Sequence, residues 1–78
     1  MDIGEIFEAA KARGLARSRR QFSRELLGMA PNYAADTGLE RCSAAALLNL
    51  HKRLGESGHH DLQARVAGIL FRRRGAGA

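Results

Sequence analysis

Arginine side chains provide most of the chemistry that this sequence can offer. Residues 11–24 include six cations and no acid, and a second run of cations, residues 72–74, lies near the C-terminus. The cations of the first segment are Lys11, Arg13, Arg17, Arg19, Arg20 and Arg24. A guanidinium group donates hydrogen bonds in a planar fork that matches phosphate and guanine. The net charge of +5 therefore favours a polyanionic partner, chiefly nucleic acid or an anionic membrane surface. The alternative is an ordinary solvated helix surface.

Residues suited to catalysis or metal binding are sparse. His59 and His60 are adjacent and would diverge on a helix, and neither they nor His51 and Cys42 form a C-x-x-C or H-x-x-x-H pair. The eight acids are scattered, and the chain has no nucleophile pair and no glycine-rich phosphate loop. We therefore expect no metal, no cofactor and no enzymatic activity. Cys42 is expected to be a small apolar residue near the core.

The length of the chain and its single cysteine set further limits. With 78 residues, we expect one domain over residues 1–74 and a disordered tail over residues 75–78. A chain this short buries only about 60% of its unfolded surface, so a partner subunit would help to complete the core. One cysteine fits a reducing compartment. Because there is no basic leader and no apolar run of about 20 residues, we expect a cytoplasmic, nucleoid-associated protein with no membrane span.

Five short helices are predicted from the spacing of apolar residues and from capping residues, so the fold class is all-α, a compact bundle. Asp2, Ser18 and Ser43 precede the first, second and fourth helices as N-caps. Pro31 opens the third helix, because proline is favoured at the first position of a helix. The helices are expected over residues 3–13, 18–28, 31–37, 44–54 and 61–73, with a loop over residues 39–42.

The second and third helices form a pair joined by a turn at Gly28, where glycine permits a positive φ angle. In this region the chain resembles the λ-repressor-like helix-turn-helix superfamily. The resemblance is carried by residues 21–33, QFSRELLGMAPNY, and by the leucine-rich helix that Ser43 caps. The chain is similar to short bacterial proteins with the pattern S-x-x-x-F-S-R-x-x-L-G-x-x-P-x-Y. The resemblance covers residues 18–54. In this superfamily a small residue usually stands four positions before the turn glycine. Here Arg24 occupies that position and the small residue is Ser23, five positions before Gly28. We therefore expect one extra residue in the second helix.

The resemblance implies that the second helix crosses a DNA backbone and that the third helix enters the major groove. The residues that it places on the DNA backbone are Arg17, Arg19, Arg20, Gln21, Arg24 and Arg41. Asn32 and Tyr33 would read base edges, with Asn32 paired to adenine, and Asp36 could accept a hydrogen bond from a cytosine amine. Local capping is the alternative for Asn32, and a place in the core is the alternative for Tyr33.

Leu70 and Phe71 widen the apolar arc of the last helix. They are either ordinary core residues or the interface of a homodimer, and repressors of this class commonly pair so as to read two half-sites. We expect the homodimer, because the core is small.

The sequence thus predicts a sequence-preferring, double-stranded DNA-binding protein, a small transcriptional regulator that acts as a repressor or an accessory factor. The alternative is an adaptor or antirepressor that binds a protein partner and keeps the helix-turn-helix scaffold without base reading. The sparsely apolar third helix and Asp36, which would repel phosphate, favour this alternative. Binding to a membrane surface through the basic tail would need a more amphipathic final helix.

Overall fold

Seven helical segments and no strand occur within residues 2–77, the part of the chain that the computed structural model describes; side chains are described for residues 2–72. The segments are α1 (Ile3–Ala12), α2 (Arg19–Gln21), η1 (Phe22–Leu26), α3 (Tyr33–Thr37), η2 (Leu39–Arg41), α4 (Ala44–Glu56) and α5 (His60–Gly77). η1 is a π-helical turn that continues α2, and η2 is a 3₁₀-helix. The predicted all-α fold is confirmed.

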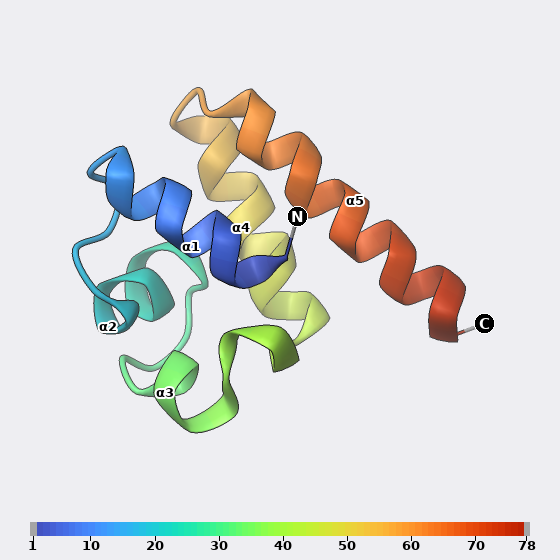
Figure 1. The fold of residues 1–78 in the computed structure, drawn as a ribbon, viewed down its shortest axis with the longest axis horizontal. Helices are drawn as coiled ribbons and strands as arrows, with labels where there is room; N and C mark the ends of the chain where they lie inside the picture. Colours follow the sequence, from blue (N-terminus) through green and yellow to red (C-terminus); the bar gives the residue numbers. More distant parts are fainter. Residues whose placement is uncertain (1, 78) are drawn as a thin grey trace.

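α4 and α5 pack against each other as a helical hairpin, and the other segments are arranged around it (Figure 1). α1 contacts α5 and η2, while η1 contacts α4 and α3. The C-terminal half of α5 extends away from the rest of the bundle (Figure 1). The Cα radius of gyration is 11.4 Å, which agrees with about 11.5 Å for a compact domain of this length.

Apolar side chains from every major segment meet in one core. The fully buried leucines of α4 face Leu62 and Val66 of α5. Phe7 of α1 and Phe22 of η1 meet edge to face, with ring centroids 5.2 Å apart, which is a favoured aromatic geometry. Cys42 is buried, as predicted. This core holds the short segments α2, η1 and α3, which are too short to be stable alone.

Three predicted N-caps are confirmed. The side chain of Asp2 accepts a hydrogen bond from the Glu5 amide at 2.8 Å. Ser18 Oγ accepts from the Gln21 amide and Ser43 Oγ accepts from the Ala46 amide, each at 3.2 Å. Each cap satisfies one of the orphan amides at the start of its helix. The caps therefore explain where α1, α2 and α4 begin.

The predicted start of the third helix at Pro31 is wrong. Pro31 and Asn32 form a turn in which the Tyr33 amide donates to the carbonyl of Ala30 at 3.0 Å. Asn32 has φ −87° and ψ 0°, the conformation of the third residue of a type I turn, and proline is favoured just before it. Pro31 is therefore a turn residue, and α3 begins two residues later than predicted.

The predicted extra residue of the second helix is present as a π-helical turn. At the end of η1 the Leu27 amide donates to the carbonyl of Phe22 at 3.0 Å, five residues back, which is the π-helical pattern. The Met29 amide donates to the carbonyl of Ser23 at 2.9 Å, six residues back, and this bond caps the C-terminus across Gly28. A π-helical turn holds one residue more than an α-helical turn, and such turns are frequent at functional sites. The insertion thus widens the helix without breaking its hydrogen bonding.

The C-terminal hairpin is longer than predicted. α4 continues through Gly55 to Glu56, and α5 begins at His60, so the polar break is confined to residues 57–59, where Gly58 has φ +79°. No helix in the described part of the chain is both long and apolar enough to cross a membrane. The predicted disordered tail, residues 75–78, falls on residues whose side chains, and for Ala78 the backbone as well, lie outside the described part. It stays a prediction.

Gly28 is a position where an added methyl group is expected to be costly. Its φ is +66°, and a Cβ would lie 2.8 Å from Nδ2 of Asn49, which donates to the carbonyl of Leu27 at 3.0 Å. Gly28→Ala should destabilise the fold by about 2–3 kcal/mol, from left-handed strain plus the displaced hydrogen bond. Gly14, with φ +75° and open space around it, provides the control. Gly14→Ala should be destabilised by the left-handed strain alone. Equal melting temperatures for the two variants would contradict this interpretation.

Candidate nucleic-acid interface

Ser23 joins the two short helices. Its side chain is fully buried, and its Oγ donates to the carbonyl of Arg19 at 2.8 Å and accepts from the Ala34 amide at 3.0 Å. Asn32, the residue before α3, makes no side-chain cap. Ser23 therefore caps α3 from a neighbouring helix, satisfying an amide that would otherwise be buried without a partner. The position of α3 depends on this contact.

The start of α2 is held by a second set of local contacts. Oε1 of Gln21 accepts from the Arg17 amide at 2.6 Å, while the Gln21 amide donates to Ser18 Oγ. This arrangement is close to a capping box, with the glutamine reaching one residue further back than usual. A phosphate contact by Gln21 would therefore have to come from its side-chain amide group. The role predicted for Gln21 stays a prediction.

Three arginines of this region lie near α3 or the turn that precedes it. Arg19 lines a cleft with Ala34 and Ala35 of α3, whereas Arg20 and Arg24 line a second cleft with Pro31. Arg19 also lies over the ring of Phe7, 5.9 Å from its centroid, which favours a fixed position for its cation.

Four of the arginines that the resemblance places on the DNA backbone are exposed and have no internal partner among the described residues. Within the part of the chain that the structure describes, no hydrogen bond and no ion pair is made by the side chains of Arg17, Arg20, Arg24 and Arg41. Their guanidinium groups can all donate to an external anion without breaking an internal contact. The first three lie on or next to α2 and η1, and Arg41 lies at the end of η2.

Arg13 is a different case. It pairs with Asp61 at the start of α5 through two hydrogen bonds, at 2.9 and 2.5 Å, and it also donates to Nδ1 of His59 at 3.2 Å. The hydrogen bond from Arg13 lowers the pKa of the Asp61 carboxyl far below its usual range. Arg13 therefore connects the end of α1 to the start of α5, and it is less available to an external anion than the exposed arginines without partners.

α3 presents few groups that could read a base. Asn32, Ala35 and Asp36 are exposed. Tyr33 is half-buried, and its hydroxyl accepts a hydrogen bond from the Ser43 amide at 2.8 Å, so it attaches α3 to the start of α4. The predicted base-reading role of Tyr33 is untested, but its hydroxyl already has a partner inside the protein.

The predicted dimer residues differ in their surroundings. Leu70 packs partly against the core, whereas Phe71 is 80% exposed. The side chains of Arg73 and Arg74 lie outside the described residues. No group of three His, Cys, Asp or Glu residues close enough to hold a metal occurs among the residues that the structure describes.

No protein-family model, no curated protein and no solved structure matches this chain. The sequence missed the bridging role of Ser23 and the contact of Tyr33 with Ser43. For Ser23 the signal was its position, because a small polar residue stands five positions before the turn glycine, where the two helices pack.

Proposed function

We propose that this chain binds double-stranded DNA as a small transcriptional regulator, a repressor or an accessory factor, and that α2 with η1 and α3 form a helix-turn-helix similar to that of λ-repressor-like proteins. The observation that carries the proposal is the group of exposed arginines near α3: Arg19 lines a cleft with α3 itself, and Arg20 and Arg24 line a cleft with Pro31 in the turn before it. A basic face next to a short, firmly positioned helix is the usual electrostatic footprint of a DNA-binding domain.

Contacts to the phosphate backbone would come mainly from α2 and its surroundings. Arg17, Arg19, Arg20 and Arg24 supply guanidinium groups, and the amides of Arg19 and Arg20 at the start of α2 have no partner within the helix, so they add a second kind of phosphate donor. Arg41 would reach the backbone from η2. Contacts of this kind fix the register of a protein on the duplex but do not read the sequence.

Base reading would be modest, because the exposed residues of α3 and its cap have short side chains. Asn32 can pair with adenine, Ala35 can contact a thymine methyl group, and Asp36 can accept from a cytosine amine. None of these residues is a cation. We therefore propose that backbone contacts contribute more to affinity than base contacts do. We also propose that the protein is cytoplasmic and associated with the nucleoid.

A homodimer through Leu70 and Phe71 is part of the proposal. The exposed ring of Phe71 on the projecting half of α5 would be covered in a dimer, and two copies would present two copies of α3 to successive half-sites.

The test of DNA binding is a fluorescence-anisotropy titration of a labelled duplex at several salt concentrations. Binding should weaken linearly on a log–log plot with a slope of about −0.9 per phosphate contact, or about −3.6 if four arginines engage. A duplex that shows no binding even at low salt would contradict the proposal.

A second candidate function is that of an adaptor or antirepressor that binds a protein partner. It is favoured by the exposed surface of α3, where Ala35 and Asp36 are better suited to a protein surface than to phosphate. The same titration separates the two candidates, because an adaptor without base reading or backbone contacts would leave the duplex unbound.

A further inference from the structure

A pocket opens next to the cleft of Arg20 and Pro31, with which it shares Arg24 and Glu25, and it lies between the loop after α1, η1 and the last turn of α4. It has a volume of about 400 Å³ and is lined by Leu15, Arg24, Glu25, Leu26, Arg53, Glu56 and Ser57. We call it the η1–α4 pocket. Its size lies within the range of about 300–1,000 Å³ that is usual for small-molecule sites.

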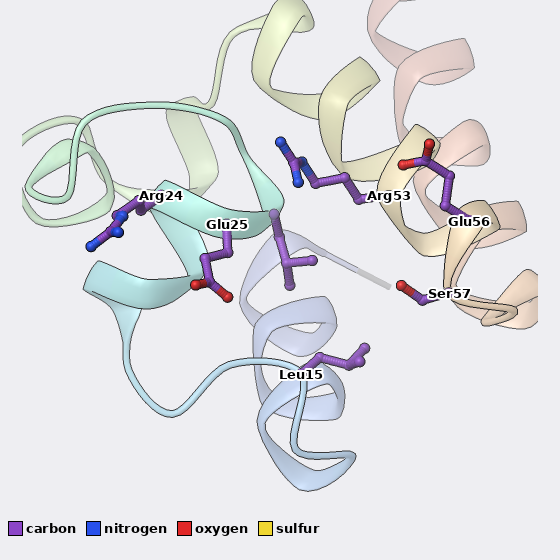
Figure 2. Close-up of a pocket in the computed structure, with 7 residues that line it drawn as sticks. Leu15, Arg24, Glu25, Arg53, Glu56 and Ser57 are labelled. Carbon is purple, nitrogen blue, oxygen red and sulfur yellow. The ribbon is translucent and has the colours of Figure 1, made fainter.

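The charges around this pocket have no partners within the protein. Among the described residues, Glu25 and Arg53 make no hydrogen bond or ion pair through their side chains, with each other or with any other group, and the same holds for Glu56. Figure 2 shows Glu25 and Arg53 extending from the two sides of the pocket, with Leu15 between and below them. A carboxylate from η1 and a guanidinium from α4 thus both belong to the lining of the pocket.

The lining also has an apolar part. Leu26 is almost fully buried and Leu15 half-buried, and both pack against the core. The hydroxyl of Ser57, the C-cap residue of α4, points towards the same space (Figure 2). Two leucines thus accompany four charged side chains and one hydroxyl, so the pocket offers a small apolar wall together with groups of both charges.

We propose that the η1–α4 pocket binds a small zwitterion with an apolar body, namely a free apolar amino acid. Arg53 would bind the carboxylate through charge-assisted hydrogen bonds, Glu25 would bind the ammonium group, and Leu15 with Leu26 would cover the side chain. The proposal does not depend on DNA binding. It has a consequence for DNA binding, however, since η1 also carries Ser23, which positions α3.

The experiment is a titration of the ¹⁵N-labelled protein with L-leucine, followed by amide chemical shifts. Saturable shifts are expected at the amides of Leu15, Glu25, Leu26 and Arg53. N-acetyl-leucine lacks the ammonium group, leucinamide lacks the carboxylate, and glycine lacks the apolar body. Each should bind about tenfold more weakly than leucine, because each leaves one wall of the pocket without its partner.

Two variants and a control complete the test. Glu25→Gln and Arg53→Gln should each weaken leucine binding about tenfold, whereas Arg65→Gln, at an exposed position of α5 outside the pocket, should leave it unchanged. The proposal is overturned if leucine causes no saturable shifts at these amides, if the three analogues bind as well as leucine, or if the pocket variants behave like the control. Because no DNA is present, failure here is distinct from failure of the proposed DNA binding.

Discussion

Reversing the charges of Arg19 and Arg20 should weaken binding to duplex DNA by about a hundredfold or more at moderate salt. Each arginine is expected to donate charge-assisted hydrogen bonds to phosphate, worth about 1.5–3 kcal/mol apiece, and a glutamate in its place would repel the same phosphate. Two such losses correspond to a factor of about 10² to 10⁴. Because phosphate contacts carry no sequence information, the loss should be similar for all duplex sequences. The measurement is the dissociation constant of Arg19→Glu/Arg20→Glu by fluorescence anisotropy.

The matched control is Lys52→Glu/Arg65→Glu. Both residues are exposed, on α4 and α5, outside the helices that carry the proposed interface. Each reversal removes two units of charge, so both double variants change the net charge from +5 to +1. If the control loses as much affinity as the α2 variant, binding depends on net charge alone, and the interface proposed here is wrong. Circular dichroism should show that both variants keep their helices.

Replacing Ser23 with alanine should lower stability and displace α3. The substitution leaves the buried Ala34 amide without an acceptor, which costs about 1–3 kcal/mol. For a domain of this size, that cost corresponds to a fall in melting temperature of about 5–20 °C. DNA affinity should also fall at temperatures where the variant is still folded, because α3 is short and has no side-chain cap of its own. Thermal unfolding and anisotropy measure the two effects separately.

Ser57→Ala is the control for the hydroxyl. Ser57 is exposed and its Oγ has no hydrogen-bond partner among the described residues, so its loss should change stability by less than about 0.5 kcal/mol. If Ser23→Ala has the same melting temperature as Ser57→Ala and the same DNA affinity as the wild type, Ser23 does not position α3.

Local signals in the sequence were sufficient for most of the fold. The caps at Asp2, Ser18 and Ser43 act on amides three residues later, so neighbouring residues contain the whole interaction. Pro31 shows the limit of such signals. Its fixed φ suits both the first position of a helix and the second position of a type I turn, and only the position of α3 within the bundle decides between them.

The candidate site was predicted in part. The arginines could be proposed as phosphate donors from the sequence alone, because an exposed cation needs no particular partner within the protein. The contacts that position them could not, because they join residues that are distant in the chain: Ser23 with Ala34, Tyr33 with Ser43, and Arg13 with Asp61. The spacing of Ser23 from Gly28 did predict one extra residue, and the structure accommodates it as the π-helical turn η1.

The central claim is that α2 and α3 together form the surface that meets duplex DNA. The most direct test is a map of amide chemical shifts when the ¹⁵N-labelled protein is titrated with a short duplex at low salt. We expect the largest changes at residues 17–21 and 32–36, and little change at the amides of the α4–α5 hairpin. Changes concentrated on α5 around Phe71 and Arg72, or no changes at all, would contradict it.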